Sequence, residues 1–196
     1  MFRWKNHQDV REEAAAYATR RDFQEIFTED MVGLHLLAFL LTADVDKAGQ
    51  CFVAGLQSSI EGNPVFRQWA RAWSKRAIIK HAIKMVAPTP GQAGTPSQAD
   101  DAALRIGNPQ ANTFMAAVTL IAAVTRLAAF ERFVLVITVL EDYSTQECAE
   151  LLSRSIEEVT TAKSQALKSL GSQAASTAVT KRSGAWAALL AATEPA

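Results

Sequence analysis

The stretch STQECAELLSRSIEE, residues 144–158, carries the same helix-start signal twice. The tetrads Ser144–Glu147 and Ser155–Glu158 both read S-x-x-E. In such a capping box the serine oxygen accepts from the backbone N–H three residues on, and the glutamate accepts from the backbone N–H of the serine. The spacing therefore predicts a helix of about two turns over Thr145–Leu152, a turn over Ser153–Ser155 and a longer second helix.

The apolar positions fit two helices that pack on each other. The predicted inner face of the short helix consists of Cys148, Ala149, Leu151 and Leu152. That of the longer helix consists of Ile156, Val159, Ala166 and Leu170. A short helix, a tight turn and a longer helix are the parts of a helix-turn-helix. On spacing alone, an αα-hairpin inside any helical bundle is an equally good interpretation.

Two more helices are expected upstream in the same half of the chain. One helical stripe consists of Phe114, Val118, Ile121 and Val124. A further helix should cover about Phe130 to Leu140. These elements predict a domain over residues 113–172, followed by a tail over 173–196. Residues 87–112 are rich in Pro and Gly, which predicts a flexible linker.

The first half predicts a three-helix domain over residues 23–86, preceded by an arm over residues 1–22. Thr28 is the expected N-cap of the first helix. The second helix should cover Lys47 to about Ile60, and the third about Val65 to Met85. The predicted fold class is therefore all-α, with two small helical domains joined by a flexible linker.

The composition narrows the classes of function. The 20 Lys or Arg balance 20 Asp or Glu, which argues against indiscriminate coating of nucleic acid or membrane. The apolar run from Phe133 to Leu140 is far shorter than the roughly 20 residues of a membrane span. The two cysteines, Cys51 and Cys148, have no metal-ligand spacing and are expected to be buried free thiols. Without a Gly-rich phosphate loop or a nucleophile elbow, we expect no cofactor, no metal and no enzymatic activity.

One segment is strongly basic. Between Val65 and Ala87 there is no acidic residue. The basic residues form two rows with a step of four: Arg67, Arg71 and Lys75, then Arg76, Lys80 and Lys84. Residues four apart stack on one side of a helix, so the rows predict a broad cationic face. Self-repulsion on such a face is relieved by nucleic acid or by an acidic protein surface.

Trp69 and Trp73 are also four residues apart in this segment. They are either core anchors of a small helical domain or platforms on which unstacked bases lie. The core interpretation is favoured because a small domain needs large apolar groups.

Over residues 23–170 the two halves, in this order and with this linker, resemble the extracytoplasmic-function class of bacterial sigma factors. Residues 66–69 followed by 77–79 look like that family's promoter-melting helix. Residues 127–140 followed by Tyr143–Leu152 are similar to its second conserved region, which leads into a recognition helix near Ser155.

The resemblance implies that this chain binds core RNA polymerase and promoter DNA in the cytoplasm. An anti-sigma factor would be a further partner. In the first domain, DNA contacts would come from Arg67, Trp69, Arg71, Trp73, Lys75, Arg76, Lys80 and Lys84. In the recognition helix they would come from Ser155, Thr160, Thr161, Lys163, Ser164 and Lys168. The polymerase-binding stretch would include Gln50, Phe52 and Val53.

A second interpretation stays open. No carboxylate lies between Asp46 and Glu61, where the family has an acidic polymerase-binding stretch, and the expected recognition helix has no arginine. The chain could therefore be a sigma-like protein-interaction or regulatory module that does not read promoters. Its partner would bind the apolar surface around Cys51 and Phe52.

Overall fold

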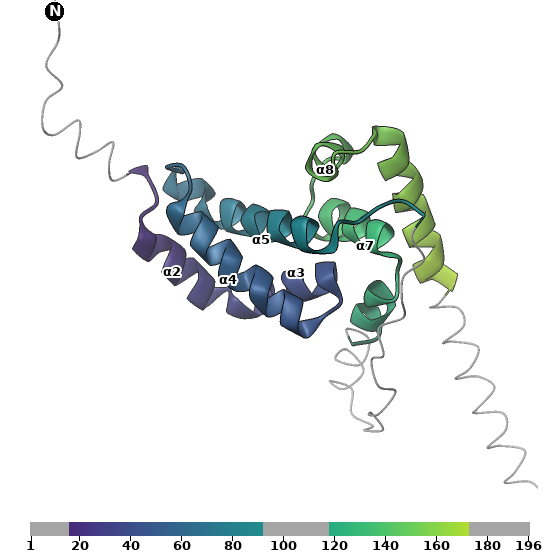
Figure 1. The fold of residues 1–196 in the computed structure, drawn as a ribbon, viewed down its shortest axis with the longest axis horizontal. Coiled ribbons are helices and arrows are strands. Elements are labelled where there is room, and N and C mark those ends of the chain that lie inside the picture. Colours follow the sequence, from purple (N-terminus) through teal and green to yellow (C-terminus); the bar gives the residue numbers. More distant parts are fainter. Residues whose placement is uncertain (1–15, 92–117, 173–196) are drawn as a thin grey trace, which may run out of the picture. The chain divides into compact units, whose positions relative to one another are not determined.

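The structure is a computed structural model that describes residues 16–91 and 118–172. The chain divides into two compact units, Met1–Thr89 and Pro90–Ala196, called here the first and second units. The described residues are mostly helical and include no β-strand, which confirms the predicted all-α class (Figure 1). Most of the predicted arm and linker, Phe114 and the whole tail lie outside the described residues. No described helix is long and apolar enough to span a bilayer.

The described part of the first unit contains four α-helices, each of which contacts the other three. They are α2 (Arg20–Glu29), α3 (Met31–Thr42), α4 (Val45–Glu61) and α5 (Ala70–Val86), and the 3₁₀ turn η1 (Arg67–Trp69) precedes α5. The prediction of three helices is therefore wrong by one. The fully buried side chains come from α3, α4 and α5, and include Leu34, Leu41, Cys51, Ile78 and Ile79.

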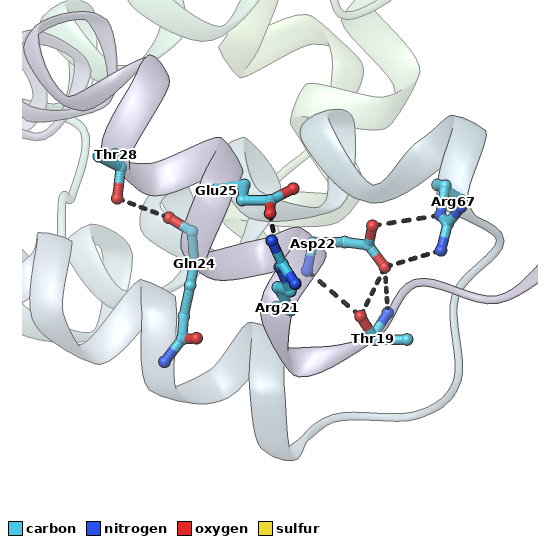
Figure 2. A network of polar contacts seen from close by, with 7 residues as sticks. All are labelled: Thr19, Arg21, Asp22, Gln24, Glu25, Thr28 and Arg67. Atoms are coloured by element: carbon cyan, nitrogen blue, oxygen red, sulfur yellow. Dashed lines mark hydrogen bonds and ion pairs between the residues drawn. The ribbon is translucent and has the colours of Figure 1, made fainter.

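The additional helix, α2, begins inside the predicted arm because Thr19 starts a capping box of its own. Thr19 Oγ1 accepts from the backbone N–H of Asp22, and the Asp22 carboxylate accepts from the backbone N–H of Thr19 at 2.7 Å (Figure 2). The prediction that Thr28 is an N-cap is wrong. Thr28 lies within α2, where its hydroxyl donates to the carbonyl of Gln24 at 2.8 Å.

Helix α4 starts two residues before the predicted Lys47 and ends one residue after the predicted Ile60. Asp44 caps its start by accepting from the backbone N–H of Lys47 at 3.0 Å, and the helix ends at Glu61, before Gly62. In contrast, α5 starts later than the predicted Val65. The Val65 carbonyl accepts from the N–H of Ala18 at 2.7 Å, and a β-bridge joins Phe66 to Tyr17. Residues 65 and 66 are therefore tied to the segment before α2 and cannot join the helix.

The contact between α4 and α5 is unusually close at Gly55. A Cβ atom there would lie 2.6 Å from Ile78 Cγ1, well inside van der Waals contact. The absence of a side chain at Gly55 thus lets α5 approach the backbone of α4. This approach fixes the side of α5 that faces the core and the side that faces solvent.

The described part of the second unit contains a helix over residues 118–125, α7 (Ala129–Leu135), α8 (Thr145–Leu152) and a helix over residues 156–172. The helix predicted over Phe130–Leu140 is confirmed, although its last turn is the π-helix η2 (Val136–Leu140). The predicted short helix has the predicted bounds. Of the stripe in residues 118–125, Val124 is buried, Ile121 is half-buried and Val118 is exposed.

The inner faces of the last two helices follow the prediction with one exception. The buried residues are Cys148, Ala149, Leu152, Val159, Ala162 and Ala166, while Leu151 and Leu170 are half-buried. Ile156 was expected inside but is 54% exposed. Burial along that helix starts at Val159, and Ala162 completes the inward line with a spacing of three and four residues.

Candidate nucleic-acid interface

Both predicted capping boxes are present in the second unit. Ser144 Oγ accepts from the N–H of Glu147 at 3.2 Å, and the Glu147 carboxylate accepts from the N–H of Ser144 at 2.9 Å. The corresponding distances for Ser155 and Glu158 are 3.1 and 2.9 Å. These bonds satisfy backbone donors that the first helical turn leaves without partners. They also lower the pKa of the Glu158 carboxyl, chiefly through the bond from the Ser155 backbone.

The turn between the two helices is tight. Ser153 adopts the left-handed conformation with φ 52°, and the N–H of Arg154 donates to the Ala149 carbonyl at 2.9 Å. Figure 1 shows α8 nearly end-on, whereas the helix that follows it runs in the plane of the view. The two helices therefore cross steeply, which is the arrangement of a helix-turn-helix rather than of an antiparallel hairpin.

The second helix of this motif presents a surface without negative charge after its first turn. No carboxylate occurs from residue 159 to 172. Thr160, Thr161, Ser164 and Lys168 are exposed, and Lys163 is half-buried. The predicted site residues beyond the cap thus lie on or beside the outer face of one helix.

The hydroxyl groups on this surface are not equivalent. Thr160 Oγ1 donates to the Ile156 carbonyl at 2.8 Å, and Ser164 Oγ donates to the Thr160 carbonyl at 3.0 Å. Their protons are used within the helix, so toward a ligand these two oxygens are acceptors. Ser155 is occupied as the N-cap. Donors to DNA would then come from Lys163, Lys168 and Thr161.

The first basic row of the first unit does not form the open cationic face that we predicted. Arg67 Nε lies 3.2 Å from Asp22 Oδ1, as Figure 2 shows. Arg71 reaches both Glu29 and Asp30, with each nitrogen–oxygen distance at 3.3 Å. The carboxylates come from α2 and the residue after it, so charge in the basic segment is balanced by residues far away in sequence.

The ion pair with Arg67 also affects the pKa of the Asp22 carboxyl. The pKa of Asp22 is lowered, first by the hydrogen bonds from the Thr19 hydroxyl and backbone and then by Arg67. Lys75, the third member of the row, is half-buried and has an interaction partner of its own. The prediction of one open cationic row is therefore wrong for Arg67 and Arg71, because both pair with carboxylates.

The second basic row has a different environment. No described carboxylate lies within ion-pair distance of Arg76, Lys80 or Lys84. Lys80 Nζ lies 5.9 Å from the centre of the Trp73 ring, in cation–π contact. These three cations are spaced by four residues along α5 and remain the candidate phosphate contacts of the first unit.

The two tryptophans have different roles. Trp73 is half-buried and packs against the core cluster of Phe23, Val65 and Ala70. Trp69 is 57% exposed and meets the Phe66 ring edge-on, with the ring centres 5.3 Å apart. The core interpretation therefore fits Trp73 and is wrong for Trp69, which is largely exposed to solvent.

The predicted polymerase-binding stretch lies on α4. Gln50 and Val53 are exposed, Val53 by 62%, and the half-buried Phe52 ring packs edge-on against Phe27 at 5.1 Å. Cys51 is fully buried, with its sulfur 3.9 Å from that of Met85. Cys51 is therefore part of the core, and of the surface expected around Cys51 and Phe52 only the neighbouring side chains reach solvent.

The described residues offer no obvious metal centre, because no three His, Cys, Asp or Glu side chains among them gather at one point. Both cysteines are free and buried, as predicted. Burial raises the pKa of Cys148 to about 11, with Lys163 opposing that change. Such a thiol is a poor ligand and a poor nucleophile at neutral pH.

No protein-family model matches the chain, and neither does any curated protein. The motifs and the geometry of the two units are therefore the basis for assigning a function.

Proposed function

We propose that this chain is a DNA-binding transcription factor of the sigma type, which associates with core RNA polymerase and directs it to promoter DNA. The observation that carries the proposal is the capped helix-turn-helix, whose second helix has no carboxylate from residue 159 to 172. A recognition helix lies in the major groove, where an acidic side chain would repel phosphate. Such a protein acts in the bacterial cytoplasm, performs no catalysis, and can be held inactive by an anti-sigma factor.

The first unit supports the same proposal with a second surface. Arg76, Lys80 and Lys84 are spaced along one side of α5 with no described carboxylate paired to them. Each cation in the row can neutralise one phosphate of a nucleic-acid strand. The exposed ring of Trp69 would allow a base to stack nearby.

The expected polymerase contact is the exposed part of α4 around Gln50, Phe52 and Val53. An exposed valine beside a partly covered aromatic ring suits an apolar contact with a partner protein. The same surface favours the second candidate function, a protein-interaction module without promoter reading.

The test uses the purified full chain, core RNA polymerase and promoter templates from the native genome. We expect the chain to co-migrate with core polymerase and to direct discrete run-off transcripts. Val53→Asp should reduce co-migration, because it places a carboxylate in an apolar contact. Lys80→Gln should leave co-migration unchanged and reduce transcription.

Lys47→Gln is the matched control, because Lys47 is a lysine of α4 whose amine lies 3.9 Å from the Asp44 carboxylate and which is not part of the second basic row. Association with polymerase without any specific transcript would favour the interaction module. Absence of both association and salt-dependent DNA binding would refute both candidates.

A further inference from the structure

A small hollow lies between α4 and α5, beside the second basic row. Its volume is about 140 Å³, below the roughly 300 Å³ at which pockets for drug-sized ligands begin. Apart from Ala77, the hollow is lined by Ser58, Trp73, Arg76, Lys80, His81 and Lys84. None of the side chains that line it is a carboxylate. The hollow therefore combines a small volume with three positive charges.

Ser58 and His81 form a polar pair within this hollow. Ser58 Oγ lies 2.7 Å from His81 Nε2, and both side chains are half-buried. The two residues are 23 positions apart and come from different helices, so the pair exists only because α4 and α5 approach closely. Burial, and then the charge of Lys84, lowers the pKa of His81, so the ring is mainly neutral at pH 7.

The neighbouring elements supply no negative charge to balance the hollow. On α4, Glu61 is one turn beyond Ser58, but this exposed residue, whose carboxylate accepts from Gln57 at 3.1 Å, does not line the hollow. On α3 the one ionisable residue is His35. The carboxylates of Asp22, Glu25 and Glu29 on α2 pair with Arg67, Arg21 and Arg71, respectively. An anion from outside would meet uncompensated positive charge.

We propose that this hollow is a seat for one phosphate group of a nucleic-acid backbone, and that the Ser58–His81 pair takes up a proton when the phosphate enters. Arg76, Lys80 and Lys84 supply the charge. The volume admits a tetrahedral oxyanion and leaves the sugar and base outside, beside Trp73. The choice of a backbone phosphate as the natural ligand rests on the proposed DNA-binding function, whereas the oxyanion site itself does not.

The proton uptake follows from the hydrogen-bonding capacity of the pair. In a neutral imidazole one nitrogen donates and the other accepts, whereas in an imidazolium both donate. When the neutral ring carries its hydrogen on Nδ1, Nε2 accepts from the Ser58 hydroxyl. Once His81 has gained a proton from solvent, Nε2–H donates to Ser58 Oγ instead. The Ser58 hydroxyl then keeps its hydrogen but no longer donates it to the ring, so it can donate to a phosphate oxygen. A bound anion also stabilises the imidazolium, so anion and proton should bind cooperatively.

The experiment follows the histidine side chains of the full chain by NMR during titration with sulfate. Sulfate is a suitable probe because it stays dianionic across the titration range of histidine, so pH changes act on the protein alone. We expect sulfate to raise the pKa of His81 and to bind more tightly at about pH 6 than at about pH 8, by at most tenfold per pH unit for one linked proton. His35 is the internal control and should not respond.

Substitutions distinguish the contribution of the basic side chains to sulfate binding from that of the proton on His81. Lys80→Gln should weaken sulfate binding about tenfold, as for the loss of one charged hydrogen bond. His81→Gln should leave a weaker affinity with no pH dependence. Lys47→Gln, a charge-matched control outside the hollow, should have no effect.

A short single-stranded oligonucleotide then identifies the source of the phosphate. Competition with sulfate, with the same His81 response, supports a backbone phosphate. If sulfate binds but the oligonucleotide does not compete, the site takes a free oxyanion, and the proposed role of this surface in DNA binding is refuted. If His81 responds to neither probe, or shifts no more than His35, the inference is overturned even where the chain binds DNA through its second unit.

Discussion

Arg71 and Arg76 lie on the same helix, yet their neighbours differ in charge. Arg71 has two carboxylates within 3.3 Å, and Arg76 has no described carboxylate at ion-pair distance. A DNA phosphate would have to displace Glu29 and Asp30 from Arg71, whereas Arg76 requires no such exchange. The sequence pattern predicted the same availability to DNA for both arginines. The tertiary structure leaves Arg76 without an ion-pair partner among the described carboxylates and pairs Arg71 with two.

Substitution of these two arginines by glutamine should therefore have different effects on DNA binding. Arg76→Gln should lower the slope of log affinity against log salt by roughly 0.9, the contribution of one phosphate contact to duplex DNA. Arg71→Gln should leave the slope unchanged. Its effect on stability should be small, below about 1 kcal/mol, because Arg71 and Glu29 are both well exposed to solvent. Affinities measured at several salt concentrations check this, and equal slopes for both variants would contradict it.

His81 should make the stability of the first unit depend on pH. Its pKa is lower in the folded chain than the ordinary value of 6.5, so the unfolded chain binds the proton more readily. The stabilising contribution is complete above about pH 6.5 and is lost as the pH falls toward the folded-state value. We expect the midpoint of thermal unfolding to fall more steeply with acidification in the native chain than in His81→Gln.

The Asp22 carboxyl should change the stability of the first unit in a separate, more acidic pH range. Its pKa is lowered from 3.8, so its contribution is present above that value and is lost below it. The contributions of His81 and Asp22 can thus be distinguished in one series of unfolding experiments at different pH. If the unfolding midpoints of the native chain and His81→Gln change in parallel between pH values of about 7 and 5, the stability does not depend on protonation of His81.

At the scale of elements, helix starts were the most predictable feature. The S-x-x-E tetrads at Ser144 and Ser155 place two helices correctly because all the groups involved lie within four consecutive residues. The T-x-x-D tetrad at Thr19 works by the same chemistry, but it lies within residues 1–22, which were predicted to be an arm. Local signals identify a cap only where a helix is already expected to follow.

The cap at Ser155 should contribute measurably to the second unit. Ser155→Ala removes the oxygen that accepts from the Glu158 N–H and should cost about 1 kcal/mol. Amide hydrogen exchange should accelerate at the start of the helix over residues 156–172. Ser169→Ala, on the same helix with no capping role, is the control, and equal effects of the two variants would argue against the cap.

Two glycines on α4 provide a matched pair for helix packing. Gly49→Ala has no atom within 4 Å of the new Cβ and should stabilise the helix by up to about 1 kcal/mol. Gly55→Ala gains the same helix propensity but meets Ile78 at 2.6 Å, and overpacking of this kind costs about 1–3 kcal/mol. Urea unfolding should show opposite signs for the two variants. Ile78→Ala removes Cγ1, so Gly55→Ala should cost less stability in an Ile78→Ala background than in the native chain.

The candidate site was less predictable than the helices. The residue types of the basic segment were visible, but their ion-pair partners lie 41 to 45 positions earlier in the chain. Ser58 and His81 carry no shared sequence signal, because their contact depends on the close approach of two helices at Gly55. Charge along a sequence shows which groups are available, and only tertiary contacts show which of them are already neutralised.

At the scale of the whole chain, two compact units each have a buried core of their own. Gly55 lies against Ile78 and Ser155 bonds to Glu158, each within its own unit, so the effects of substitutions at these two positions on stability should add. We expect Ser155→Ala to change hydrogen exchange only in the second unit and Gly55→Ala only in the first. A double variant whose protection differs from the sum of the two single effects by more than about 0.5 kcal/mol would indicate coupling between the units.

The chain has two cysteines, and the structure buries one in each unit: Cys51 in the first and Cys148 in the second. Neither sulfur can meet an alkylating reagent until its own unit opens. The two thiols are therefore natural labelling sites. The rate at which each cysteine-containing peptide becomes alkylated, measured by mass spectrometry, would report how fast each unit opens, without any engineered probe. The same pair would reveal which half DNA or polymerase holds closed, because a ligand slows labelling only where it binds.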